Sequence, residues 1–395
     1  MQRVSRVGRM LQMLPSPMSE RLDGHSHNVV SSSSLWINGR YVSFDNILHE
    51  IEESRSPFEE TTFAFMKAWL SGEESFQLTT SGSTGAPKTI SVTRTQMVAS
   101  ARHTAQKINL QKQSTALVCI DTKYIGGKMM LARALTFGLP IMAVEPTANP
   151  LIKIPVDKCV QFTAFVPYQV TAVLESKHPH LLNNLDKVLI GGAPLNATTR
   201  QQLGHFNCEC YETYGMTETV SHIALKLANT DRKQQYFEVL PGVEISQDDR
   251  GCLLVSADFL PKTIVTNDLV ELVGPGRFSW LGRWDTVINS GGVKVVPEKI
   301  EKEIEKIFSE NNLNVRFFIA ASPDEKLGNK IVLILEGVQF SSELLNRSLA
   351  ALKTAVSPFE FPKEVYSIPE FVLTETQKID RIQTLPGVNI LSSLK

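Results

Sequence analysis

The chain has 395 residues, with 40 lysine and arginine residues against 41 aspartate and glutamate residues, and a formal net charge of −1. Hydrophobic residues make up 42% and charged residues 21% of it, which is typical of a globular protein and not of a disordered chain, a collagen or a coiled coil. A nucleic-acid partner is not expected, because no excess of positive charge is available to neutralise phosphates. Five scattered cysteines favour a reducing, cytoplasmic compartment over a disulfide framework. No apolar run is long enough to predict a membrane span.

The first 34 residues differ from the rest in composition. They contain Arg3, Arg6 and Arg9, end in a serine run and hold only two acidic residues. Organelle transit peptides have this composition, and so do disordered leaders; a misassigned start ahead of Met18 is a third reading. We expect residues 1–34 to be a disordered leader that contributes little to the fold.

From residue 115 onward, short apolar runs alternate with segments of helical periodicity. The expected strands are 116–120, 140–144, 162–166 and 188–190, and the expected helices are 128–137, 168–177 and 197–206. This alternation predicts an α/β fold with parallel strands joined by helical crossovers. Beyond residue 235, the segments 253–256, 263–266 and 269–273 are short and β-rich, and they predict a small antiparallel sheet or barrel.

A third unit is expected to begin at Pro297. This proline opens a helix that places Ile300, Ile304, Ile307 and Phe308 on one face. The strands 315–320, 330–335 and 365–368 and the helix 343–355 follow. The pattern predicts a compact α+β domain at the carboxyl end.

A loop rich in hydroxyl groups carries the first chemical signal. Residues 79–88 contain five hydroxyl side chains, two glycines and Lys88. Glycines let backbone N–H groups turn inward, and a lysine adds positive charge, so the loop is suited to a polyphosphate. It is not a Walker A loop, because Pro87 stands where that motif needs glycine. A flexible turn between strands is the structural alternative.

Further short motifs follow in a fixed order. They are Gly191–Pro194 after an expected strand, Tyr211–Glu218, Asn267–Asp268, Gly282–Asp285, Ser290–Glu298 and Gln377–Arg381. In this order and spacing, residues 77–382 resemble the adenylate-forming superfamily of acyl-CoA synthetases, peptide-synthetase adenylation domains and luciferases. The resemblance implies that a carboxylate is activated with ATP to an acyl-adenylate and pyrophosphate, and that CoA then accepts the acyl group.

The resemblance also implies roles for individual residues. The ATP-phosphate loop would consist of Thr80, Ser81, Gly82, Ser83, Thr84, Gly85 and Lys88, and the adenine slot of Gly192, Ala193 and Pro194 with Tyr214 stacking on the ring. Asp268 would accept both ribose hydroxyls, and Arg283 would bind ribose or phosphate. Thr217 would contact the α-phosphate, and Glu218 with Thr84 would bind Mg²⁺. Lys378 would bridge the attacking carboxylate and the α-phosphate.

The same resemblance predicts the domain organisation. Asp285 would be the hinge between an AMP-binding N-terminal domain with a small β subdomain, residues 35–282, and a small, mobile C-terminal domain, residues 283–395. Gly291 and Gly292 would face CoA. The chain departs from the family in its early phosphate loop, in Asn289 where many members carry lysine, and in Gln377 where glycine is usual.

The acid substrate is indicated by two features. The short N-terminal part and residues 124–133 resemble o-succinylbenzoate–CoA ligases of menaquinone biosynthesis, whose substrate is a dicarboxylate. Lys128 and Arg133 are candidates to bind the second carboxylate, and ordinary surface cations are the alternative. Thr219, Ser221 and His222 could line the acyl pocket, although His222 is equally well read as a core histidine.

Other functions remain open at this point. They are another aryl- or acyl-CoA ligase, an adenylating enzyme that loads a carrier protein, and a nucleotide-binding module without catalysis. Cys208 and Cys210 superficially suggest zinc, but C-x-C without a second pair matches no common site. The sequence leaves the oligomeric state open, a homodimer included.

Overall fold

The computed structural model describes residues 33–79, 89–229, 236–311, 313, 315–337, 342–373, 379–385 and 389–393. Residues 1–32 of the expected leader lie outside these ranges, and strand β1 (Ser34–Ile37) begins at its last residue. The expected phosphate loop from Thr80 to Lys88 and the expected catalytic Lys378 also lie outside the described residues.

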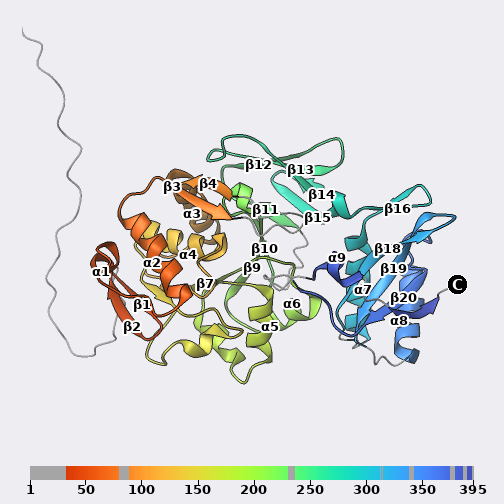
Figure 1. Cartoon of the computed structure of the whole chain (residues 1–395), viewed down its shortest axis with the longest axis horizontal. Helices are drawn as coiled ribbons and strands as arrows, with labels where there is room; N and C mark the ends of the chain where they lie inside the picture. Colours follow the sequence, from red (N-terminus) through yellow and green to blue (C-terminus); the bar gives the residue numbers. More distant parts are fainter. Residues whose placement is uncertain are drawn as a thin grey trace, which may run out of the picture.

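One large sheet organises the N-terminal part of the chain (Figure 1). Its described strands run in the order β12-β13-β14-β15-β11-β10-β9-β8-β7-β5-β6-β1-β2. The parallel half contains β1, β5 (Ala116–Val118), β6 (Ile141–Ala143), β7 (Phe162–Phe165), β8 (Lys187–Ile190) and β9 (Glu209–Gly215), with β2 (Arg40–Ser43) antiparallel at the edge. The other half is antiparallel: β10 (His222–Leu227), β11 (Phe237–Val239), β12 (Val243–Gln247), β13 (Cys252–Ala257), β14 (Ile264–Gly274) and β15 (Arg277–Arg283).

Helices cover both faces of the parallel half. In β5, Leu117 belongs to one hydrophobic cluster while Ala116 and Val118 belong to another, because successive side chains of a strand point to opposite faces. The elements around these strands are α1 (Phe44–Leu48), α2 (Pro57–Leu70), the hairpin β3 (Ser75–Thr79) and β4 (Thr89–Thr93), α3 (Arg94–Ile108), α4 (Ile125–Phe137), α5 (Pro167–Glu175), α6 (Ala197–Leu203) and the 3₁₀ turns Pro150–Lys153 and Pro179–Asn184. Helix α3 starts at a capping box between Thr93 and Gln96, which satisfies two backbone donors that a helix start leaves free.

The C-terminal unit has its own core. It consists of β16 (Ile288–Ser290), β17 (Val293–Val295), α7 (Pro297–Glu310), β18 (Phe317–Asp324), β19 (Gly328–Glu336), α8 (Ser342–Ala355), β20 (Glu364–Ile368), α9 (Arg381–Thr384) and β21 (Asn389–Ser393). The expected face of α7 is confirmed, since Ile300, Ile304, Ile307 and Phe308 are all buried. Helix α7 also contacts the N-terminal part, where the Glu305 carboxylate accepts a hydrogen bond of 2.9 Å from the backbone N–H of Ala197.

Two features differ from the sequence-based expectation. The segments 263–266 and 269–273 form the single strand β14, and the antiparallel strands continue the large sheet instead of forming a separate one, because β15 pairs with β11 and β11 with β10. All five cysteines are described and free, as expected. Within the described ranges, no helix is long and apolar enough to cross a membrane.

Two adjacent glycines near the start of α4 give a stability test. A Cβ on Gly127 would lie 2.6 Å from the carbonyl oxygens of Ile120 and Asp121, whereas a Cβ on Gly126 would meet only the Ile120 side chain at 3.6 Å. We expect Gly127→Ala to lower the free energy of unfolding by about 1–3 kcal/mol through overpacking. Gly126→Ala is the matched control and should stabilise by up to about 1 kcal/mol through helix propensity. Denaturant unfolding measures both, and equal effects would contradict the close approach of Gly127 to the backbone of Ile120 and Asp121.

Candidate active site

The carboxyl ends of β8 and β9 carry the expected adenine motif. Gly191 lies directly after β8, and a Cβ there would be 2.6 Å from the Thr213 hydroxyl of β9. Gly192 has φ +99°, a conformation that favours glycine, and with Ala193 and Pro194 it is exposed. The register of β8 and β9 ends where Ile190 pairs with Glu212, and Tyr214 lies two residues further along β9. The structure therefore leaves exposed backbone at the carboxyl ends of the parallel strands, where α/β proteins bind nucleotides.

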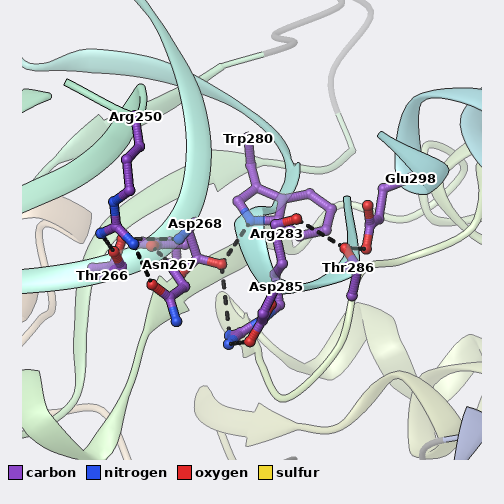
Figure 2. Close-up of polar contacts among 10 residues, drawn as sticks. Arg250, Thr266, Asn267, Asp268, Trp280, Arg283, Asp285, Thr286 and Glu298 are labelled. Atoms are coloured by element: carbon purple, nitrogen blue, oxygen red, sulfur yellow. Dashed lines mark hydrogen bonds and ion pairs between the residues drawn. The ribbon is translucent and has the colours of Figure 1, made fainter. Parts of the chain in front are cut away.

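Asp268 of β14 is the centre of a polar cluster beside that edge (Figure 2). It is only 7% exposed. Its Oδ2 accepts a hydrogen bond of 2.6 Å from the Tyr214 hydroxyl, and its Oδ1 accepts one of 3.1 Å from Trp280 Nε1. Burial, followed by the charge of Asp268, raises the pKa of Tyr214, so this phenol remains a donor. The structure thus joins two expected nucleotide residues through a direct contact.

Arg283 and Asp285 form a bidentate ion pair at the end of β15. Arg283 Nε and Nη2 donate to the two Asp285 carboxylate oxygens at 2.8 and 2.6 Å, and Arg283 Nη1 lies 3.9 Å from Asp268 Oδ1. Hydrogen bonding to Arg283 lowers the pKa of Asp285. Thr286 ties the next position to α7 by donating to Glu298 at 2.9 Å. The expected hinge residue is therefore held by the residue expected to bind nucleotide.

Gly291 and Gly292 form the turn between β16 and β17. Both have positive φ, +59° and +84°, which two-residue hairpin turns require. The backbone N–H of Gly291 donates to the Leu327 carbonyl at 2.9 Å. No described contact tests their expected role toward CoA.

The turn between β9 and β10 is fixed from within. Thr219 is fully buried, its Oγ1 accepts from Met216 N at 3.0 Å, and it also lies 2.9 Å from Met216 O and 2.7 Å from Ser221 O. Val220 has φ +67°, a strained conformation for a β-branched residue. Gly215 permits the close pairing that follows, since a Cβ there would lie 2.3 Å from His222 Cα. The hydroxyl of Thr219 therefore stabilises this turn through its contacts with Met216 and Ser221.

Thr217 and Glu218 lie on the outer side of this turn. Glu218 is exposed, and its carboxylate has no hydrogen-bond or ion-pair partner within the described ranges. A free carboxylate of this kind suits Mg²⁺, which prefers one or two protein carboxylates together with phosphate oxygens and water. Glu218 therefore fits the metal-binding role that the sequence predicts, while Thr84 lies outside the described residues.

Arg133 of α4 is a buried cation. Arg133 is only 2% exposed. Its Nη2 donates to Ser221 Oγ at 2.9 Å and lies 3.4 Å from His222 Nδ1, while its Nε has no partner among the described residues. Burial lowers the pKa of Arg133 to about 9. No acidic side chain of the described ranges pairs with this guanidinium, so its charge is balanced by neutral groups alone.

His222 completes the network around this cation. Its Nε2 lies 2.9 Å from the Thr104 hydroxyl, which donates to the Ser100 carbonyl at 2.9 Å. Because Arg133 donates to Nδ1, the proton of the neutral imidazole lies on Nε2 and points to Thr104. Burial, with a smaller contribution from Arg133, lowers the pKa of His222 well below its ordinary value.

Lys128 lies elsewhere on α4. It is half-buried, its Nζ lies 3.4 Å from the Gln77 carbonyl oxygen, and burial lowers its pKa. The structure therefore brings Arg133, Ser221 and His222 together and leaves Lys128 outside that contact network.

The sequence did not predict the contacts that three residues make around the site. Trp280 and Thr104 were overlooked because each acts through a contact across strands or between a helix and a strand. The buried Glu212, which pairs with Arg200 and Lys226 at 2.7 and 3.1 Å and anchors β9, was noted only as part of a motif. A tryptophan just before the Gly282–Arg283 pair was the one local signal that could have indicated Trp280.

The AMP-binding enzyme family matches residues 40–252, more than half of the chain. The 2-succinylbenzoate–CoA ligase of Oceanobacillus iheyensis is 23% identical over 364 residues, which cover 84% of this chain and 74% of that protein. The enzyme of the same name from Salmonella typhimurium is 24% identical and covers 82% and 71%.

Solved structures agree with the family match. An acyl-CoA synthetase (AMP-forming)/AMP-acid ligase II-like protein from Dyadobacter fermentans is 40% identical, covers 86% of this chain and 97% of that one, and gives a TM-score of 0.57. The o-succinylbenzoate CoA synthetase of Bacillus subtilis, in complex with its acyl-adenylate OSB-AMP, is 19% identical, covers 78% and 68%, and gives a TM-score of 0.67. The second similarity concerns the fold alone.

The neutral state of His222 predicts a pH effect on stability. The unfolded chain binds a proton at this residue below about pH 6.5, whereas the native state does not, so stability falls as the pH drops through that value. His222→Gln keeps a donor toward Thr104 but cannot be protonated. Between pH 7 and pH 5, we expect its free energy of unfolding to fall by about 1–2 kcal/mol less than that of the wild type. Unfolding curves at both pH values measure this difference. Parallel losses in the two proteins would show that His222 titrates normally.

Proposed function

The chain belongs to the AMP-binding enzyme family, and on that premise we propose that it is an ATP-dependent acid–CoA ligase. Its proposed acid is 2-succinylbenzoate, which it would convert to 2-succinylbenzoyl-CoA through an acyl-adenylate, as in menaquinone biosynthesis. The curated relatives named for this activity support the choice of acid. The observation that carries the proposal is the buried guanidinium of Arg133, which has no acidic partner within the described ranges.

Binding of the proposed substrate would offset the unfavourable free energy of burying this cation. An isolated buried charge is unfavourable by several kcal/mol unless an opposite charge joins it. A dicarboxylate brings one carboxylate for the reaction and a second that can pair with Arg133, and Ser221 adds a hydroxyl beside it. The free Nε of Arg133 gives the second carboxylate a donor that no described group occupies. A long fatty acid would leave the guanidinium unpaired.

The first half-reaction is attack by the acid carboxylate on the α-phosphorus of ATP, with pyrophosphate leaving. A carboxylate is a poor nucleophile toward a polyanion, so the site has to neutralise charge before in-line attack. In this proposal Lys378 and the 80–88 loop supply the cations and donors, Thr217 contacts the α-phosphate and Asp268 holds the ribose. Mg²⁺, when bound at Glu218, supplies further charge neutralisation.

The second half-reaction is attack by the CoA thiol on the acyl carbonyl carbon, with AMP as the leaving group. We assign the turn of Gly291 and Gly292 to the CoA side and Asp285 to the hinge of the domain rotation between the two steps. The bidentate pair of Arg283 and Asp285 would then be remade or broken as the C-terminal domain turns. A carrier-loading enzyme would share the first step and ignore free CoA, which separates it from this proposal.

Substitution of Arg133 tests the choice of acid. We expect Arg133→Met to lower kcat/KM for 2-succinylbenzoate by about 10²–10³, the scale for losing one partner of a buried charge pair. The keto acid that lacks the ring carboxylate should be nearly unaffected by the substitution. Arg102→Met, an exposed arginine of α3, is the matched control, and Lys128→Met compares the second candidate cation. Equal losses for both acids would show that Arg133 does not bind the second carboxylate.

Substitution of Lys378 tests the chemistry. We expect Lys378→Ala to slow acid-dependent ATP–pyrophosphate exchange by about 10²–10³, the scale for losing one transition-state donor. The transfer of the acyl group from preformed acyl-adenylate to CoA should continue at the wild-type rate. An unchanged exchange rate would remove Lys378 from the adenylation step.

A further inference from the structure

We propose that Trp280 is a positioning residue for the nucleotide, because its indole N–H fixes the Asp268 carboxylate in the orientation that accepts a ribose diol. This inference rests on the proposed function, and it adds a residue that none of the expected motifs contains. It concerns Trp280 through its contact with Asp268, since the indole itself is assigned no contact with substrate.

Two donors hold the Asp268 carboxylate. The Tyr214 hydroxyl from β9 donates to Oδ2 at 2.6 Å, and Trp280 Nε1 from β15 donates to Oδ1 at 3.1 Å. The Asp268 backbone is fixed separately, since its N–H donates to Thr266 Oγ1 at 3.0 Å. Figure 2 shows the indole of Trp280 linked to Asp268 by a dashed line. One donor on each oxygen prevents the carboxylate from turning about its Cβ–Cγ bond.

The remaining lone pairs match a vicinal diol. An ionised carboxylate has about four acceptor sites, and the two protein donors occupy one site on each oxygen. One site on each oxygen is left, which is what two neighbouring hydroxyl donors need. A carboxylate free to rotate would present these sites in many directions and would lose part of its affinity to the cost of being ordered.

The strand register explains how Trp280 reaches this position. Val270 of β14 pairs with Trp280, Leu269 pairs with Gly282 and Asp268 pairs with Arg283, so Leu281 is an extra residue in β15. Such a bulge redirects the neighbouring side chains. The bulge makes Trp280 the diagonal neighbour of Asp268, at a separation that an aromatic side chain can span.

Packing alone does not account for a tryptophan here. Trp280 is half-buried and lies at the margin of the large hydrophobic cluster, so phenylalanine would fill most of the same space. What phenylalanine lacks is the N–H that Oδ1 accepts. Comparing Trp280→Phe with the wild type therefore separates the effect of losing the hydrogen bond from the effect of losing packing.

The test compares ATP with 2′-deoxy-ATP as ligands. Calorimetric titration of the full chain in the absence of acid substrate gives the affinity ratio of the two nucleotides directly. We expect the wild type to prefer ATP and Trp280→Phe to lower this preference about 5- to 20-fold, mainly by weakening ATP binding. In pyrophosphate exchange the same variant should raise KM for ATP and leave kcat within about threefold.

Two controls make the result specific. Trp36→Phe, at a buried tryptophan of β1 in the second hydrophobic cluster, repeats the loss of an indole and should leave the nucleotide preference unchanged. In an Asp268→Asn background, Trp280→Phe should have little further effect on the preference, because the carboxylate that it orients is gone.

The outcomes are separable from those that test the proposed function. An unchanged preference in Trp280→Phe overturns the positioning role, and so does a wild type that binds both nucleotides equally. Binding of ATP with the expected preference but without exchange for any acid overturns the proposed ligase and leaves the role of Trp280 standing.

Discussion

A buried guanidinium that has no carboxylate partner among the described residues is the constraint on which the proposed acyl side of the site depends. Within the described part of the chain, Arg133 contacts only neutral side chains, the Ser221 hydroxyl and an imidazole kept neutral by burial. The His222 ring is in turn fixed by Thr104 of α3. A core that needed packing alone would place an apolar side chain here at lower cost. In the proposed function, this arrangement would keep a positive charge in place before the acid binds, which is the preorganisation that selective binding of a dicarboxylate requires.

The turn between β9 and β10 connects this cation to the nucleotide side. Tyr214, the residue before the last one of β9, contacts Asp268, while His222 begins β10 and contacts Arg133. The ends of the two strands lie close together because Gly215 has no Cβ to clash with His222. The Thr219 hydroxyl stabilises the turn through its contacts with Met216 and Ser221. In the proposed function, the acid and the nucleotide would then meet near Thr217 and Glu218 of this turn. An acyl-adenylate has this form, with a nucleotide at one end and an acyl group at the other.

The sequence predicts those features whose signals are local. The strands and helices between residues 115 and 206 and the buried face of α7 follow from periodicity and from glycine and proline positions. The joining of β14 and β15 to the large sheet, and the contact of Trp280 with Asp268, depend on pairing and a bulge that no local pattern contains. Lys128 and Arg133 could be named but not ranked, because residues five apart on a helix point about 140° apart, and only the packing of α4 decides which one is buried.

Acid-dependent ATP–pyrophosphate exchange with Mg²⁺ tests the central claim most directly, with 2-succinylbenzoate, benzoate, succinate and a medium-chain fatty acid compared under the same conditions. A site built around a buried cation and an aromatic dicarboxylate predicts exchange that is selective for 2-succinylbenzoate. Benzoate lacks the second carboxylate, and succinate lacks the ring. The fatty acid has only the carboxylate that reacts, so none is left to pair with Arg133. Faster exchange with the fatty acid or with benzoate than with 2-succinylbenzoate would contradict the account.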